Sequence, residues 1–297
     1  MRLRLLLSLV LVAFPLAARA QTLAPMSPTP TTSPTPAPSA SPTGDYCSNG
    51  GLGALVSRPT QTNSVCVVPS GHTLIETGYQ SQTVLGGAAG LTYQSVPDAT
   101  VRIASPLHDV EVQVFPPIAY RVDGTSATSD IGIGLKWQIA ATPTFAYGVS
   151  ASNTLVTGTN PLTNVAGLGS ATVPTQNYSA QFAWQLGKVF GLAGGLELSE
   201  LASALATGPQ HYASTLPSLE LSDALPASWS LFVEGFTQSH GEGPGTPTHV
   251  WGDAGVSKDI GSAQLDVEYG ASNAIVVAPS LPLVRRHYVG AGVSYEF

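Results

Sequence analysis

The chain ends in His287-Tyr-Val-Gly-Ala-Gly-Val-Ser-Tyr-Glu-Phe297, and this stretch decides the predicted fold. Its residues alternate, so an extended strand presents an apolar face and a face of small or polar residues. A strand of about 9 to 11 residues crosses a bilayer when its backbone is paired in a closed barrel. Val293, Tyr295 and the terminal Phe297 resemble the signal by which outer-membrane barrels are recognised for assembly. The alternative that this segment leaves open is a soluble domain ending on an edge strand.

The first twenty residues have the organisation of a signal peptide. Two arginines precede an apolar run over 5–16, and Ala18-Arg19-Ala20 supplies a small-x-small cleavage site. We place the mature start at Gln21. The apolar run is too short to span as a helix, and no cysteine follows the cleavage site to accept a lipid. A mature chain in a membrane is therefore expected to be a barrel.

The composition limits the class of protein. Only 10% of residues are charged and 31 are glycine, whereas an ordinary globular domain carries about 25% charged residues. Without the three arginines of the signal peptide, 8 basic and 18 acidic side chains remain, a net charge of about −10. A nucleic-acid binder needs a basic surface, so this class is excluded.

The mature chain begins with two unusual segments. Residues 21–44 are almost entirely Pro, Thr, Ser and Ala without a charge, which predicts a disordered, extended linker. Residues 45–70 contain Cys47 and Cys66, and in an exported protein such a pair predicts one disulfide, worth ~3 kcal/mol for a loop of this length. No companion histidines accompany the pair, so we predict no metal site. The sequence leaves open whether 47–68 folds back into the barrel as a partial plug.

From 71 to 297 the chain consists of alternating runs separated by clusters of Gly, Pro, Asn, Asp and Ser. In the run over 130–139, Leu135 and Trp137 share the apolar face, and Lys136 lies on the other. Runs over 178–186, 229–234 and 263–269 show the same period of two. Because the polar face is polar in each run, we predict a transmembrane antiparallel barrel.

We predict twelve strands, an even number as in single-chain bacterial barrels. Short connections at 142–143, 187–188 and 259–262 alternate with long ones at 156–175, 201–214, 239–246 and 274–284, as expected for periplasmic turns and outer loops. A soluble β-sandwich or a secreted adhesin is the competing fold. The predicted strands are 72–82, 98–106, 109–121, 129–140, 143–155, 176–187, 189–200, 215–223, 227–238, 246–258, 261–273 and 285–297.

The segment from Arg58 to Gln80, RPTQTNSVCVVPSGHTLIETGYQ, is similar to the start of a family of outer-membrane proteins described as transporters or as meta-pathway phenol-degradation proteins. Residues 129–137 and 288–297 also resemble that family, and the resemblance covers 45–297 in scattered blocks. It implies an outer-membrane barrel with a part in the passage of aromatic or other hydrophobic compounds. It brings no catalytic motif, and the Pro-rich linker departs from the family pattern.

The lumen is the surface where we expect function. Its excess of carboxylates would favour cations or neutral solutes, because charged rings bias a pore. Alternatively, Arg102, Arg121 and Lys136 pair with some carboxylates across the lumen as structural bridges, which a narrow barrel allows. Phe232 and Phe236 are also predicted to point inward, with filling space favoured over lining a solute path. The candidate lumen-lining residues are Glu76, Arg102, Glu111, Asp130, Lys136, Glu197, Glu234, Asp253, Asp266 and Glu268, and Glu220 is also predicted to face inward.

The sequence therefore predicts a channel or transporter for small, aromatic or hydrophobic, solutes in the bacterial outer membrane. The expected partners are outer-membrane lipids and the barrel assembly machinery, and no cofactor is expected. A structural or adhesin-like secreted β-protein is the alternative, and a lipid hydrolase is a remote one. Ser239 precedes His240, but neighbours on an extended chain point apart, and their surroundings are typical of a loop tip. We predict no catalytic residue.

Overall fold

The computed structural model describes residues 44–297, apart from 86–90, 123–124, 160–173, 206–207, 241–247 and 276–284. The predicted signal peptide and nearly all of the predicted linker lie outside the described residues. The elements are α2 (Tyr46–Asn49), α3 (Gly51–Leu55), β1 (Thr73–Leu85), β2 (Leu91–Ala104), β3 (Val110–Phe115), β4 (Ala119–Val122), β5 (Thr125–Thr128), β6 (Ile131–Ala141), β7 (Phe145–Leu155), β8 (Gln176–Gln185), β9 (Phe190–Leu205), β10 (Gly208–Leu225), the short 3₁₀ turn η1 (Pro226–Ser228), β11 (Trp229–Gln238), β12 (Thr248–Ile260), β13 (Ala263–Ile275) and β14 (Arg285–Glu296).

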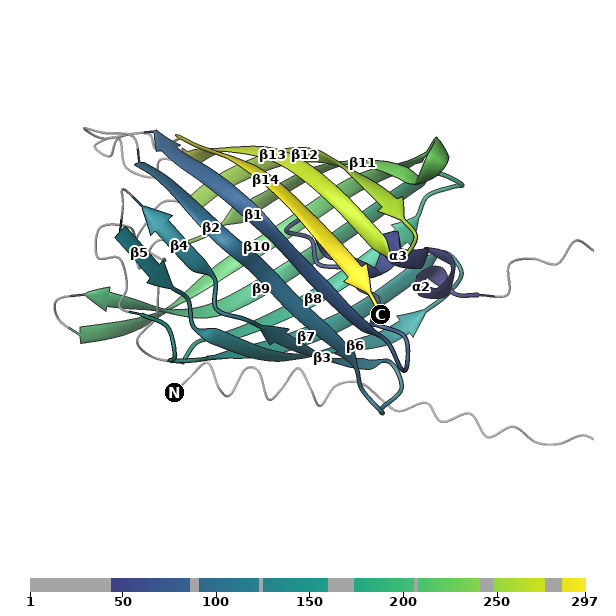
Figure 1. The fold of residues 1–297 in the computed structure, drawn as a ribbon, viewed down its shortest axis with the longest axis horizontal. Coiled ribbons are helices and arrows are strands. Elements are labelled where there is room, and N and C mark those ends of the chain that lie inside the picture. The colour runs from purple at the N-terminus through teal and green to yellow at the C-terminus, as the bar shows by residue number, and fades with distance from the viewer. Residues whose placement is uncertain are drawn as a thin grey trace, which may run out of the picture. The chain divides into compact units, whose positions relative to one another are not determined.

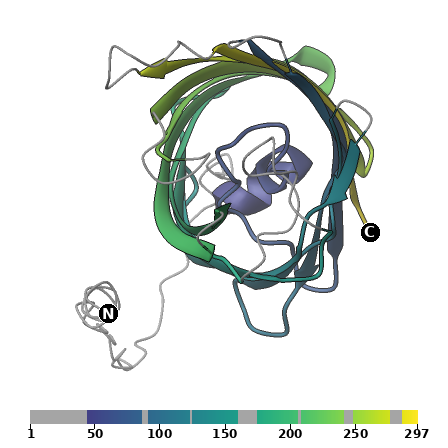
Figure 2. The ribbon, with the colours of Figure 1, turned by 90° about the vertical axis from the view of Figure 1, so that its left-hand side faces the viewer.

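The strands form one antiparallel sheet that closes on itself (Figure 1). β1 pairs with β14 from Leu74 opposite Glu296 to Leu85 opposite Arg285, and its other edge pairs with β2. Seen from the end, the sheet is a closed ring (Figure 2). Closure pairs the backbone groups that a bilayer would leave without partners. The competing prediction of a sandwich of two open sheets is therefore wrong.

The fourteen strand segments make twelve wall strands, as the sequence predicts. β3 and β4 both pair with β2, at different heights, so they are two parts of one strand. β6 and β5 pair with those two parts and form the next strand. The break between β3 and β4 contains Pro116-Pro117, and proline lacks the N–H that a sheet ladder needs.

Two predicted boundaries are wrong. The segment 201–214 was expected to be a long loop, but β9 and β10 continue through most of it, with Leu205 opposite Gly208, and the hairpin projects at the end away from the C-terminus (Figure 1). Its Gly, Pro and Ser residues favour a loop, yet paired strands satisfy the backbone groups equally well. β2 begins at Leu91 instead of 98, because a register shift opposite Gly78 to Gln80 accommodates Pro97 inside the strand.

The outer surface of the barrel is apolar. On β6, Ile133, Leu135 and Trp137 are about half exposed, whereas Lys136 between them is buried. The same alternation leaves Val289, Val293 and Tyr295 outside on β14 and Ser294 inside. Among the described residues, no helix is long and apolar enough to cross a bilayer. The short turns lie at the same end as the C-terminus (Figure 1), which is the periplasmic end in barrels of this kind.

The outer face gives a test of membrane insertion. Leu135→Arg, in the middle of β6, should destabilise the barrel by roughly 2–4 kcal/mol, because the charge would face hydrocarbon. The matched control is Leu107→Arg in the exposed turn between β2 and β3, where the same change should alter stability by less than about 0.5 kcal/mol. Reversible urea unfolding in lipid vesicles measures both. Equal losses at the two sites would argue against a lipid-facing β6.

Candidate functional site

The lumen contains the residues that precede β1. Residues 44–72, here called the plug segment, carry α2 and α3 and lie inside the ring of strands (Figure 2). Asp45 starts α2 by accepting a hydrogen bond from the N–H of Ser48 at 2.8 Å, as an N-cap residue does. The predicted disulfide between Cys47 and Cys66 is confirmed, and it joins the two limbs of the segment. The plug that the sequence left open is therefore present.

Apolar contacts hold the periplasmic half of the plug segment. Its buried residues are Leu52, Leu55, Val56, Val65, Cys66 and Val68, and they pack with Leu74, Ala146 and Ala183 of the wall. The N–H of Tyr46 donates to the carbonyl of Thr142 at 2.7 Å. Burial, with a smaller contribution from Glu220, raises the pKa of Tyr46, so its phenol stays neutral.

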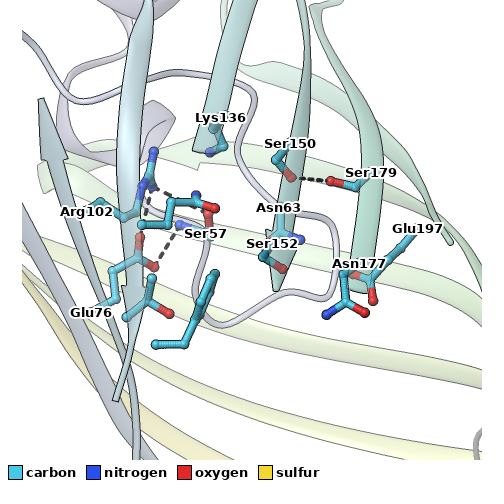
Figure 3. Close-up of a pocket in the computed structure, with 13 residues that line it drawn as sticks. Ser57, Asn63, Glu76, Arg102, Lys136, Ser150, Ser152, Asn177, Ser179 and Glu197 are labelled. Carbon is cyan, nitrogen blue, oxygen red and sulfur yellow. Dashed lines mark hydrogen bonds and ion pairs between the residues drawn. The ribbon is translucent and has the colours of Figure 1, made fainter. Parts of the chain in front are cut away.

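Two buried cations of the wall hold the carbonyls of the plug segment. Arg102 on β2 donates to the carbonyl oxygens of Leu55 and, at 2.6 Å, of Cys66. Lys136 on β6 donates to the carbonyl of Ser64 at 2.5 Å. The two side chains reach into the lumen from neighbouring parts of the wall (Figure 3). A free carbonyl in such a buried place would cost stability, so these contacts fix the path of the segment.

Three buried carboxylates of the wall hold the amides of the plug segment. Glu76 accepts from the N–H groups of Ser57 and Arg58, each at 3.0 Å. Glu234, on the opposite part of the wall, accepts from Gln61 and Thr62 at 2.8 and 2.6 Å. In addition, Glu111 accepts from the N–H of Val68 at 2.9 Å. Charged hydrogen bonds of this kind are about twice as strong as neutral ones, so the plug is bound to both sides of the barrel.

The same groups pair with one another. The guanidinium of Arg102 lies 2.9 Å from Glu76 and 2.8 Å from Glu111, and Nζ of Lys136 lies 3.6 Å from Glu111. Glu111 and Lys136 are directly opposite each other on β3 and β6. Arg102 and Lys136 therefore form ion pairs, but these join neighbouring strands, and the bridges across the lumen that the sequence suggested are not found among the described residues.

Arg58 of the plug segment was not predicted to have a role. Its guanidinium lies against Gly78 of β1 and Gly292 of β14, where a Cβ would come within 2.5 Å of it. From there it lies 3.6 Å from carboxylate oxygens of Asp98 and Asp266. The two wall glycines make room for the side chain, so their lack of a Cβ is part of the site. Gly78 and Gly292 are paired across β1 and β14, and this glycine pair on the lumen face was the signal that a large side chain lies over it.

The other predicted lumen residues have different positions. Asp130 accepts from the N–H groups of Thr157 and Gly158, at 2.9 and 2.8 Å, and so holds the start of an outer loop. Glu197 accepts from Ser199 at 2.8 Å. Phe232 is buried inside, over Gly255. The inward prediction for Arg121 is wrong: it is exposed opposite Gln94, next to the inward pair Ser95 and Tyr120, so the alternation places it outside.

A polar cavity of about 120 Å³ lies beside the plug segment, toward β7, β8 and β9 (Figure 3). Its far wall carries small hydroxyl and amide side chains with one carboxylate, and its near wall carries the anchoring groups of the plug. The lining residues are Ser57, Asn63, Glu76, Thr100, Arg102, Gln113, Phe115, Lys136, Ser150, Ser152, Asn177, Ser179 and Glu197. A second cavity, of about 350 Å³, lies at the periplasmic end between the plug segment and the turn from β2 to β3.

The wall formed by β11 to β14 is acidic and aromatic. Asp253, Asp266 and Glu268 are buried there, as predicted inward positions. Phe236, Trp251 and Tyr288 form a buried aromatic cluster on the same wall. Trp251 and Tyr288 were not predicted, although Trp251 lies two residues before Asp253 and so shares its face. That alternation was the signal that could have found it.

Comparisons with known proteins give similarity in structure. No protein-family model matches the chain, and no curated protein sequence is detectably similar to it. The COG4313 outer membrane channel from Pseudomonas putida F1 has 13% sequence identity and a TM-score of 0.62, over 80% of this chain and 100% of that chain. The translocator domain of autotransporter NalP from Neisseria meningitidis has 12% identity and a TM-score of 0.48, over 77% and 90%. The toluene transporter TodX from Pseudomonas putida has 10% identity and a TM-score of 0.42, over 83% and 93%.

The likeness to the COG4313 channel shows a shared fold. Together with the apolar outer surface, the closed twelve-stranded ring defines the class: the chain is a β-barrel of the bacterial outer membrane. The sequence resemblance to the meta-pathway family is supported only as far as the outer-membrane barrel fold. Membership of that family stays a prediction.

Proposed function

We propose that the protein is a narrow outer-membrane channel that passes small cationic or neutral solutes between its plug segment and its wall. The observation that carries this proposal is the division of the lumen charges. Arg102 and Lys136 are taken up by Glu76 and Glu111. The buried carboxylates Glu234, Asp253 and Glu268 have no ion pair among the described residues. A lumen with unbalanced carboxylates favours cations over anions.

The proposed path is narrow because the plug segment is bound to the wall on two sides. Lys136 and Arg102 hold it on one side and Glu234 on the other. The polar cavity of about 120 Å³ leaves room for a few water molecules or a small solute. Its hydroxyl and amide lining replaces the hydration of a polar solute. This lining supports polar more than purely hydrocarbon solutes for that side of the lumen.

We infer no enzymatic role. The hydroxyl of Ser239 accepts the N–H of Thr215 at 2.9 Å and lies 2.9 Å from the hydroxyl of the same residue. A nucleophile needs a base within hydrogen-bond reach, and none of the described contacts of Ser239 is to His240. A barrel closed by its plug, without transport, is the second candidate, and the dense anchoring of the plug favours it.

Ion selectivity separates these candidates. Refolded protein in a planar bilayer, under a gradient of KCl, should conduct in defined steps and show a reversal potential toward that of K⁺. A lumen potential of a few kT corresponds to a cation preference on the order of tenfold. A preference for chloride would contradict the proposal. If protein that a heat-modifiability gel shows to be folded carries no current, the closed barrel is supported instead.

A further inference from the structure

We infer that the inner face of β11 to β14 carries a binding subsite for an organic cation bearing an ammonium group. The subsite consists of the rings of Phe236, Trp251 and Tyr288 and the carboxylates of Asp253 and Glu268. The inference rests on the proposed channel function, because such a solute reaches the subsite only through the lumen. It adds a substrate class to the general cation preference.

The aromatic part of the subsite is ordered and buried. Phe236 and Trp251 are stacked, with ring centroids 5.7 Å apart and planes within 9°. Tyr288 approaches Trp251 at 5.7 Å with planes tilted by 54°. The rings come from three strands, and none of the three residues is more than 7% exposed. Aromatic faces attract cations, and tryptophan does so most strongly.

The acidic part lies beside the rings. The phenol of Tyr288 reaches across Gly270 of β13 to donate to Oδ2 of Asp253 on β12, at 2.6 Å. The carboxylate of Glu268 lies over Gly290 of β14 in the same way. Gly270 therefore lets the phenol of Tyr288 cross β13 to Asp253, and Gly290 makes room for the carboxylate of Glu268.

Three polar atoms around these rings have no hydrogen-bond partner among the described residues. Oδ1 of Asp253, Oε2 of Glu268 and Nε1 of Trp251 are all buried, and none forms a hydrogen bond within the described part of the chain. By contrast, Glu76 and Glu111 on the other wall accept hydrogen bonds at both oxygens. A buried polar group without a partner costs about 1–3 kcal/mol, and more if it is charged. If Phe236 only filled space in the lumen, as the sequence suggested, apolar neighbours would serve equally well. That role does not explain why Asp253, Glu268 and Trp251 place unpartnered polar atoms beside it.

Among the described residues, the cations of the lumen form no ion pair or hydrogen bond with Asp253 or Glu268. Arg58 lies 3.6 Å from Asp98 and from Asp266, and Arg102 and Lys136 hold Glu76 and Glu111. Arg286, on the same face of β14 as Tyr288, already has an interaction of its own. An ammonium group beside the rings would donate to both carboxylates, and its hydrocarbon part would lie against Trp251. This combination of carboxylates and rings is the chemistry that recognises organic ammonium ions.

Trp251 provides its own reporter. The other three tryptophans, Trp137, Trp184 and Trp229, are about half exposed on the outer face, so changing them to Phe leaves a single tryptophan in the lumen. Phenethylammonium titrated into this refolded, full-length protein should change the Trp251 fluorescence saturably. Its neutral match, 2-phenylethanol, should bind at least about tenfold more weakly, because it lacks the charge.

The variant Asp253→Asn with Glu268→Gln should weaken phenethylammonium binding by about tenfold or more and leave 2-phenylethanol binding unchanged. The control is Asp109→Asn in the turn between β2 and β3, which has φ of 59°, a conformation that asparagine tolerates, and it should bind like the parent. Asp253→Asn alone keeps the shape of the side chain and gives the same test if the double variant does not refold.

Equal affinity for the amine and the alcohol, or amine binding unchanged in the refolded carboxylate variants, would overturn the subsite. This binding assay does not depend on conductance. Saturable amine binding in a protein that carries no current would keep the subsite and reject the channel. Current with cation preference but no charge-dependent binding would keep the channel and reject the subsite.

Discussion

Replacing Arg102 with Met should release the plug segment and destabilise the folded protein by about 3–5 kcal/mol, the usual result of removing one partner from a buried ion pair. Glu76 and Glu111 would then remain buried, with only Lys136 near Glu111. The carbonyls of Leu55 and Cys66 would also lose their donor. Urea unfolding of refolded protein in detergent measures the loss of stability. Limited proteolysis of 44–72 and single-channel conductance measure release of the plug, and both should increase.

Arg121→Met is the matched control for this experiment. Arg121 lies on β4, in the wall strand next to β2, but it is exposed outside the barrel. The same change there should alter stability by less than about 0.5 kcal/mol and leave the conductance as it is. If Arg102→Met behaves like Arg121→Met, the plug is held by its apolar contacts and its disulfide, and the charges are not its anchor.

The lumen charges therefore have two separate roles. Those toward β1, β2, β3 and β6 form a closed network with the plug segment, in which Glu76, Arg102 and Glu111 satisfy one another and the plug backbone. Those toward β11 to β14 are unbalanced, apart from Asp266 beside Arg58. Within this second group Glu234 also anchors the plug segment, so Asp253 and Glu268 are the carboxylates that remain to act on a solute. A simple count of inward charges would assign selectivity to both groups.

The wall of the barrel is predictable from the sequence because its physics is local. Each strand has one face toward lipid and one toward polar side chains, so a period of two in residues such as Leu135, Lys136 and Trp137 reveals it. The number of strands and the outward face of β14 follow from that period together with the turn residues between the runs. The prediction weakens where the pattern does: at Pro97 inside β2, at the hairpin of β9 and β10, and at Arg121, where short strand pieces leave too few residues to set the phase.

The contents of the barrel are not predictable in the same way. The anchors of the plug are hydrogen bonds between wall side chains and backbone groups, such as Glu234 with the N–H of Thr62, 172 positions away in sequence. Every residue except proline has the same backbone N–H and carbonyl groups, so the sequence does not show which of them a wall side chain will bind. The disulfide between Cys47 and Cys66 was predictable, because only two cysteines exist to pair. It indicated that the segment is folded, but not where it lies.

Deleting Phe297 should reduce the amount of folded barrel in the outer membrane severalfold, with little effect on refolding into detergent. In the finished barrel the side chain is largely exposed, with its ring centroid 4.7 Å from that of Tyr295. Its N–H donates to the carbonyl of Thr73 at 2.9 Å. Loss of these contacts at the membrane interface should cost only a few kcal/mol. An assembly machinery that reads the end of the chain would instead lose its signal completely.

Phe190→Ala separates recognition from packing. Phe190 is also an exposed aromatic residue at the short-turn end, at the start of β9, so it shares the interface position of Phe297 without being terminal. If Phe297 acts as a signal, its deletion should lower the heat-modifiable protein in isolated outer membranes far more than Phe190→Ala does, while both variants refold in vitro like the parent. Equal losses for the two variants, in membranes and in detergent alike, would mean that Phe297 acts by packing, because a packing contact has the same value wherever the barrel is formed.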